Sequence, residues 1–161
     1  MITFHRAKIE EVTEIKKLLH ETWMATYLDI YSAEAIEKVT SEWHSVERLT
    51  KNIQDPLSFF CVAKDGNKIV GMCNTTRYEG GVVNIVRLHV SPHYQRQGIG
   101  SKLIKEAIKA FPKASKIDLE VEKQNYRALA FYKKHGFKEV GKKVFKVAKV
   151  SISCIVMKKT I

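Results

Sequence analysis

The sequence predicts a mixed α+β fold, formed by residues 1–161 as a single domain around a central sheet of six or seven mostly antiparallel strands. Three observations lead to this prediction. Short apolar runs with strand-like alternation recur along the chain between glycine turns, which is typical of strands joined in a meander. Near the N-terminus, apolar residues instead recur at the spacing of an amphipathic helix. In residues 83–110, a strand pattern passes through a glycine turn into a helix pattern.

The first sixty residues are predicted to form one strand and three helices. Residues 2–6 alternate in polarity and indicate the strand. Further helices are expected from Ser32, as N-cap, to Val39 and from Ser45 to about Ile53. Between the first two helices, residues 22–28 are interpreted as an unusually aromatic connecting segment. The first helix is indicated by four apolar residues on one helical face: Val12, Ile15, Leu18 and Leu19.

The rest of the chain predicts most of the sheet. Residues 57–63 and 68–75 flank the turn Asp65-Gly66-Asn67 and indicate a hairpin, and a second glycine turn leads into the central strand at Val83. After the helix that opens at Gly98, a strand parallel to the central one is expected. A last helix should be capped by Asn125 and end at Gly136. The three strands expected after the central one span residues 116–121, 138–141 and 150–157.

Composition excludes several classes of protein. The chain has no run of 18 apolar residues and no signal-peptide pattern, so we expect a cytoplasmic protein with no contact with a membrane. Its three cysteines, Cys61, Cys73 and Cys154, are widely spaced within apolar strand patterns, which favours buried thiols over disulfides. Because the six histidines show no ligand-like spacing, no metal site is predicted.

The net charge of +11 is unevenly distributed. Residues 1–60 hold ten acidic residues and seven Lys or Arg, whereas residues 61–161 hold seven acidic residues and twenty-one Lys or Arg. This asymmetry suits an enzyme that binds a polyanionic cofactor with its C-terminal half and a cationic amine nearer its N-terminus, and a merely solvated lysine-rich surface is the alternative. No nucleic-acid partner is predicted, because no helix-turn-helix or basic aromatic motif is present.

The glycine turn before the central helix predicts an anion site. Backbone N–H groups of such a turn converge with the free N–H groups of the first helical turn, and the helix dipole adds partial positive charge. Gly98 and Gly100 match neither the dinucleotide fingerprint, because Leu103 stands where its third glycine would be, nor the Walker loop. What remains is Gln95-x-x-Gly98-x-Gly100. An ordinary glycine corner between strand and helix is the alternative interpretation.

A second motif, beginning at Asn125, resembles a known family. The chain reads Asn125-x-x-Ala128-x-x-Phe131-Tyr132-x-x-x-Gly136-Phe137. With the glycine turn, this resembles the GNAT superfamily of N-acetyltransferases, whose patterns are [QR]-x-x-G-x-[GA] and N-x-x-A-x-x-F-Y-x-x-x-G-F. The resemblance is close for residues 68–137. It implies a GNAT-like fold, with the sheet splayed between strands four and five and helices on both faces, and acetyl-CoA as the donor substrate.

The resemblance also implies which residues contact acetyl-CoA. Three residues at the end of the central strand would lie along the pantetheine arm, and the residues of the glycine turn would surround the pyrophosphate. Tyr132 would be the catalytic residue, since the equivalent tyrosine of many relatives protonates the departing thiolate. The cofactor-binding residues implied are Leu88, His89, Val90, Gln95, Arg96, Gln97, Gly98, Ile99, Gly100, Ser101, Asn125, Ala128 and Tyr132.

The general base is not identified by the family pattern. Some GNAT enzymes carry a glutamate eleven residues before the phosphate-loop motif, and this chain has Asn84 there, which cannot act as a base. Glu79, Glu120 and Glu122 are carboxylates near the expected strand ends, and one of them could act through a water chain. His89 is a further candidate, although its side chain could face away from the substrate.

The acceptor is expected to be a small amine. Residues 21–27 and 32–34 resemble the PaiA-like branch, associated with spermidine and spermine acetylation. Trp23, Tyr27 and Tyr31 could form a cation–π wall for a polyamine, or could simply pack helices together. We take Trp23, Tyr27 and Glu79 as candidate substrate residues. The alternatives are acetylation of a protein N-terminus or lysine, and a noncatalytic regulator that binds acetyl-CoA or nucleic acid. A homodimer formed through C-terminal strands is left open.

Overall fold

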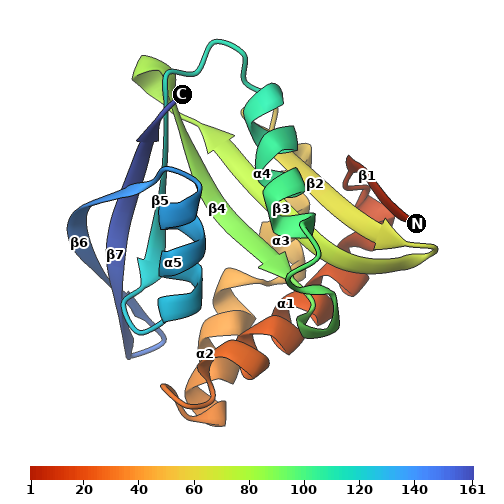
Figure 1. Cartoon of the computed structure of the whole chain (residues 1–161). Coiled ribbons are helices and arrows are strands. Elements are labelled where there is room, and N and C mark those ends of the chain that lie inside the picture. The colour runs from red at the N-terminus through yellow and green to blue at the C-terminus, as the bar shows by residue number, and fades with distance from the viewer.

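Seven strands form one sheet in the order β1-β2-β3-β4-β5-β7-β6 in the computed structural model, which describes residues 1–161 (Figure 1). All neighbouring strands are antiparallel except β4 and β5, which are parallel. The predicted mixed α+β class and its mostly antiparallel sheet are therefore confirmed. The strands are β1 (Ile2–Arg6), β2 (Ser58–Asp65), β3 (Lys68–Arg77), β4 (Val82–Val90), β5 (Lys116–Glu122), β6 (Lys138–Val147) and β7 (Val150–Thr160).

Helices cover both faces of this sheet, as expected (Figure 1). On one face, α4 and α5 pack over a core of sixteen buried residues that includes Cys73, Ile85 and Leu103. On the other face, α1 and α3 pack over a second core that includes Leu19, Leu49 and Met72. Because β3 is covered on both faces, its interior residues are almost all buried. The helices are α1 (Val12–Tyr27), α2 (Ala33–Trp43), α3 (Val46–Gln54), α4 (Ile99–Lys109) and α5 (Tyr126–Lys134).

Two predicted helix caps, Ser32 and Asn125, are confirmed, and Ser45, predicted as the start of a helix, is a third. The side chains of Ser32, Ser45 and Asn125 each accept a hydrogen bond from the backbone N–H three residues further on, at 3.1, 3.1 and 3.2 Å. Such a bond satisfies one of the free N–H groups of the first helical turn. Local sequence chemistry therefore determines where α2, α3 and α5 begin.

Residues 22–28 are not a connecting segment, and that expectation was wrong. Helix α1 continues through them to Tyr27, because Trp23 and Tyr27 are buried in a third core, between α2 and the β6–β7 hairpin. Helix α2 likewise runs past Val39 to Trp43, whose side chain packs against the same core. Strand β6 continues past Gly141 to Val147, since its whole length pairs with β7. In each case tertiary contacts extend an element that was expected to end earlier.

Strands β4 and β5 pair only over their first residues. Val82–Ile85 are aligned with Lys116–Leu119, and beyond these residues the two strands have no partners in each other. An irregularity in the β3–β4 pairing leaves Val86 as an extra residue in β4, opposite the step from Asn74 to Thr75. A β-bulge bends its strand and increases the local twist. Its position at the point of separation explains how the sheet opens here.

Leu103→Ala is expected to destabilise the fold by about 2 to 5 kcal/mol, since its side chain is fully buried between α4 and the sheet. The free energy of unfolding from urea titrations would measure the loss. Lys105→Ala on the exposed face of the same helix is the control, and its effect should stay within about 0.5 kcal/mol. Equal losses in the two variants would contradict the packing of α4 described here.

All three cysteines are buried and free, as predicted. Burial raises the pKa of the Cys61 thiol from 9.0 to about 11 and that of the Tyr27 hydroxyl from 10.0 to about 12. The folded chain therefore keeps these protons to a higher pH than the unfolded chain does. The stabilisation that comes from burying these two protonated groups is fully present at a pH below their pKa values in the unfolded chain. It is lost as the pH rises through their pKa values in the folded chain. We expect urea midpoints to fall between about pH 8 and pH 11, and an unchanged midpoint would contradict the burial of these groups.

No helix of the chain is long and apolar enough to cross a membrane.

Candidate active site

A large cleft, with a volume of about 1490 Å³, opens where β4 and β5 separate. Side chains from α1, β4, β5, α5 and the β6–β7 hairpin line it, together with the turn before α4. Twelve of the thirteen predicted cofactor residues line this cleft, and Gln97 is the exception. The Gln97 side-chain amide instead donates to the His93 carbonyl at 3.3 Å. The structure also places Trp23 and Tyr27 in the cleft, but not Glu79.

Glu79 lies at the wrong end of the strands to reach the cleft. It is exposed in the turn between β3 and β4, next to the residues where β4 still pairs with β5. The expectation that Glu79 lies near the splayed strand ends was therefore wrong. Glu120 and Glu122, at the far end of β5, do line the cleft.

The turn before α4 presents free backbone N–H groups to the cleft. Arg96 has φ = 62° and Gly98, the N-cap of α4, has φ = 81°, so the chain reverses tightly here. The N–H groups of Arg96, Gln97 and Gly98 donate no backbone hydrogen bond within the chain. The first N–H groups of α4 are free as well, and the helix dipole adds partial positive charge at this end. This arrangement can bind a phosphate or pyrophosphate group.

Hydrogen bonds link the start of α4 to α5. Because the Phe131 carbonyl can only accept, Nδ1 of His135 donates to it, at 2.8 Å. The Nε2 atom of the same ring shares a hydrogen bond with the Ser101 hydroxyl, also at 2.8 Å. Asn125, besides capping α5, donates its side-chain amide to the Tyr27 hydroxyl at 3.2 Å. The two helices and α1 are thereby held in register around the cleft.

Tyr132 lies in the wall of the cleft and is only 7% exposed. No hydrogen bond within the chain perturbs its hydroxyl. Burial raises the pKa of Tyr132 far above its ordinary value, and nearby Cys73 and Tyr27 add to the increase. The hydroxyl therefore stays protonated at neutral pH and is free to donate a hydrogen bond into the cleft.

Carboxylates occupy the opposite side of β5 from the buried core. Ile117, Leu119 and Val121 face the core with α4, so Asp118, Glu120 and Glu122 alternate onto the other face. The Asn84 amide donates to Asp118 at 2.8 Å and to Glu120 at 3.4 Å. Asn84 thus connects two carboxylates at the position where some relatives carry a glutamate.

Glu122 is buried, at 5% exposure, yet lines the cleft. Its carboxylate accepts from the Gln124 N–H at 2.8 Å and from the Tyr31 hydroxyl at 3.4 Å. Glu120 is more open and lies 3.8 Å from the ammonium group of Lys143. A cation on the hairpin β6–β7 therefore already approaches this acidic side.

Aromatic rings line the same cleft as these carboxylates. The Trp23 ring contacts those of Tyr27 and Trp43 at centroid distances of 4.5 and 5.9 Å, and Trp43 meets Phe145 at 5.7 Å. Trp23 and Tyr27 therefore pack helices and line the cleft at once. Trp43, Lys143 and Phe145 were not predicted as site residues, because only the folded hairpin and α2 bring them to the cleft.

His89 is not suited to act as the base. The Thr22 hydroxyl donates to the Leu19 carbonyl at 3.0 Å, so at 3.1 Å the Nδ1–H group of His89 must donate to the Thr22 oxygen. Burial, with a contribution from the charge of Arg87, lowers the pKa of His89 to about 4. Nδ1 is thus engaged as a donor, and the nearby positive charge of Arg87 opposes protonation of this buried ring.

No set of side chains here is suited to bind a metal ion. The chain contains no group of three His, Cys, Asp or Glu side chains placed to hold a metal ion.

Comparisons with known proteins agree with this geometry. The family model for the Acetyltransferase (GNAT) family matches residues 14–137. A spermidine N(1)-acetyltransferase of Thermoplasma acidophilum is 30% identical over 143 residues, which cover 85% of this chain and 88% of that protein. The N-alpha-acetyltransferase RimI of Mycobacterium tuberculosis is 31% identical over 94 residues, or 56% of this chain and 59% of that protein.

Solved structures similar over the whole chain include one with a bound ligand. The PaiA N-acetyltransferase of Thermoplasma acidophilum, determined in complex with coenzyme A, superposes with a TM-score of 0.85 at 27% identity. The match covers 100% of this chain and 99% of that one.

Proposed function

The chain belongs to the GNAT family of acetyltransferases and uses acetyl-CoA as its acetyl donor, and from this premise we propose that its acceptor is a small polyamine such as spermidine or spermine. The observation that carries the proposal is the pairing of an acidic strand face with an aromatic wall in one cleft. The 30% identical spermidine acetyltransferase supports the same acceptor class.

The spacing of the carboxylates suits a polyamine. Glu120 and Glu122 are two residues apart on β5, so their backbones are about 6.6 Å apart. At ordinary bond lengths, amines joined by three or four methylene groups lie roughly 5 to 6 Å apart. Two neighbouring ammonium groups can therefore each meet a carboxylate, while the rings of Trp23, Trp43 and Phe145 attract the same charges through cation–π contacts.

In the proposed reaction, the amine attacks the thioester carbon of acetyl-CoA directly, within a ternary complex. A C–N bond forms and the C–S bond breaks, and Tyr132 hydrogen-bonds or protonates the departing thiolate. The amine must first lose a proton, and we assign that step to Glu122 acting through water, because this carboxylate is buried in the cleft wall. The free N–H groups at the end of β4 are suited to stabilise the oxyanion that develops.

The proposal is tested by measuring thiol release from acetyl-CoA with single acceptors. Spermidine, spermine, a monoamine of equal length, a lysine peptide and a peptide with a free N-terminus would each be offered separately. Polyamines should give the highest kcat/KM. A preference for either peptide would instead make the chain a protein acetyltransferase, and cofactor binding without turnover on any amine would favour a regulatory role.

Glu120→Gln is expected to raise KM for spermidine roughly tenfold, since one charge-assisted contact with an ammonium group would be lost. The effect on a monoamine should be smaller. Glu79→Gln removes the same charge outside the cleft and is the control. Equal KM changes in the two variants would mean that long-range charge, and not the β5 carboxylates, attracts the acceptor.

A further inference from the structure

Lys143 places an ammonium group of the chain itself beside the carboxylates of the acceptor cleft. Successive side chains of a strand point to opposite faces of its sheet. Along β6, Lys143 and Phe145 therefore share the face that lines the cleft, and Lys142 and Val144 lie on the other face. The amino-acid order of one strand thus presents a cation and an aromatic ring to the cleft together.

The ammonium group of Lys143 has two partners in the cleft. It lies 3.8 Å from Oε1 of Glu120 and 4.7 Å from the centroid of the Phe145 ring. A carboxylate combined with an aromatic face is a favourable environment for an organic ammonium ion. The side chain of Lys143 therefore occupies the kind of subsite that a polyamine requires.

The two carboxylates proposed to meet the acceptor differ in their present partners. Oε2 of Glu120 accepts from the Asn84 amide at 3.4 Å, which leaves Oε1 to the ammonium group of Lys143. Glu122 accepts two hydrogen bonds from uncharged donors of the chain and forms no ion pair with a lysine or arginine. Of the two, Glu120 is thus the one that already holds a cation.

The contact between Lys143 and Glu120 can be exchanged for another. The Lys143 side chain is 54% exposed and that of Glu120 is 26% exposed, and ion pairs this open to water are weak. The flexible four-carbon stem of a lysine allows its ammonium group to move while the backbone stays in place. Strand β6 itself is held by β7 along its whole length. Lys143 can therefore leave Glu120 without disturbing the hairpin.

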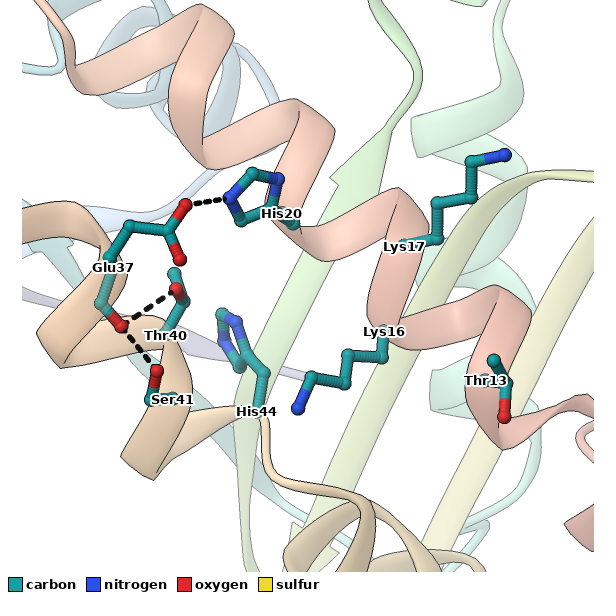
Figure 2. Close-up of a pocket in the computed structure, with 8 residues that line it drawn as sticks. All are labelled: Thr13, Lys16, Lys17, His20, Glu37, Thr40, Ser41 and His44. Atoms are coloured by element: carbon teal, nitrogen blue, oxygen red, sulfur yellow. Dashed lines mark hydrogen bonds and ion pairs between the residues drawn. The ribbon is translucent and has the colours of Figure 1, made fainter. Parts of the chain in front are cut away.

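A smaller hollow between α1 and α2 offers no second subsite of this kind. Figure 2 shows its one carboxylate, that of Glu37, paired with His20, and two lysines, Lys16 and Lys17, belong to the same lining. No phenylalanine, tyrosine or tryptophan ring lines this hollow to attract an ammonium group. The ammonium groups of an acceptor are therefore expected in the cleft and not here.

Building on the polyamine acceptor proposed above, we propose that Lys143 is a resident competitor of that acceptor. Its ammonium group occupies the subsite of Glu120 and Phe145 that receives one ammonium group of the polyamine, and it is displaced when the polyamine binds. Lys143 therefore raises KM for acceptors that carry a second ammonium group. A monoamine places its one amine at the thioester, so its KM should not depend on Lys143.

The test compares KM values of lysine variants with spermidine, spermine and a monoamine of equal length. Assays would be run at saturating acetyl-CoA and constant ionic strength, because salt screens exposed charges. Lys143→Gln should lower KM for spermidine by about two- to fivefold, the range that an exposed ion pair allows, and leave KM for the monoamine unchanged. Lys142→Gln removes the same charge from the outer face of β6 and is the matched control. In a Glu120→Gln background, Lys143→Gln should have no effect, because the contested carboxylate is gone.

The possible results separate this inference from the proposed function. Equal KM changes in the Lys143 and Lys142 variants would show a general effect of charge and would overturn the competition. So would a KM for spermidine that rises in Lys143→Gln, or a decrease that persists in the Glu120→Gln background. These results leave the polyamine acceptor intact, because the unmodified chain still acetylates it. If neither the unmodified chain nor any variant acetylates spermidine or spermine, the proposed acceptor is wrong and the subsite is wrong with it.

Discussion

Replacing Tyr132 with phenylalanine is expected to lower kcat for acetyl transfer by roughly a hundredfold, within the range by which a positioned proton donor accelerates a reaction. The loss follows from the state of the hydroxyl. Burial keeps it protonated, and no other group of the chain perturbs it by a hydrogen bond, so it is available to the leaving thiolate. Because its pKa is raised, the contribution of Tyr132 to kcat should not decline between about pH 7 and pH 10.

The measurement is steady-state thiol release with spermidine, together with the dissociation constant of coenzyme A from calorimetry. Phenylalanine keeps the ring, so coenzyme A affinity should change little while kcat falls. Tyr126→Phe removes a hydroxyl from an exposed position of the same helix that also lines the cleft, so it controls for a general effect of losing a hydroxyl there. If kcat of the Tyr132 variant stayed within twofold of the unmodified protein, the thiolate would leave without help from this residue.

The sequence predicted the strands and the turn of the proposed acetyl-CoA site well because local chemistry determines them. Alternating polarity indicated β4, and the Asn125 cap indicated the start of α5. The glycine turn and the free N–H groups of the first turn of α4 indicated the anion site. Each of these signals lies within about ten residues. The direction of the Gln97 side chain, which turns to the His93 carbonyl, could not be predicted, because a motif gives the residues of a turn while their directions depend on backbone angles such as φ = 62° at Arg96.

The acceptor side could not be predicted to the same degree, because distant segments build it. Nothing near residues 22–28 indicates that the β6–β7 hairpin will bury Trp23, which is what continues the helix there. The bulge at Val86 carries no glycine to mark it, so the place where β4 leaves β5 was inferred only from family resemblance. Trp43 could have been noticed as an apolar residue beside polar Glu42 and His44, but no sequence rule assigns it to a cleft.

Asn84 illustrates how a departure from a family pattern is resolved by structure. Its amide cannot take a proton, but it donates hydrogen bonds to Asp118 and Glu120 of β5, and Glu120 lines the cleft. The carboxylate missing from β4 is thus matched by carboxylates on the neighbouring strand.

Replacing Gly100 with valine is expected to raise KM for acetyl-CoA roughly a hundredfold. A Cβ atom at Gly100 would lie 3.2 Å from the Phe131 ring and 3.9 Å from Val90, where the end of β4 meets α5. Alanine should be tolerated, because the far edge of the Phe131 ring can shift by a few tenths of an ångström. The branched methyl groups of valine should push the turn away from α5 and misdirect its free N–H groups. Hydrogen bonds to charged groups contribute about 1.5 to 3 kcal/mol each, so one or two lost contacts account for the expected change.

Calorimetric titration with coenzyme A and the KM for acetyl-CoA would together measure this effect. Gly141→Val is the matched control, because a Cβ at that exposed β6 position meets no atom within 4 Å. Overpacking against Phe131 should lower the urea midpoint of the Gly100 variant, so both variants would be assayed under conditions in which urea titrations show them fully folded. Weakened coenzyme A binding in the Gly100 variant alone, with kcat at saturating acetyl-CoA retained, would assign the turn before α4 to cofactor binding and not to chemistry. Unchanged affinity in both variants would mean that the pyrophosphate binds elsewhere in the cleft, and Arg96 and Gly98 would then be an ordinary corner between β4 and α4.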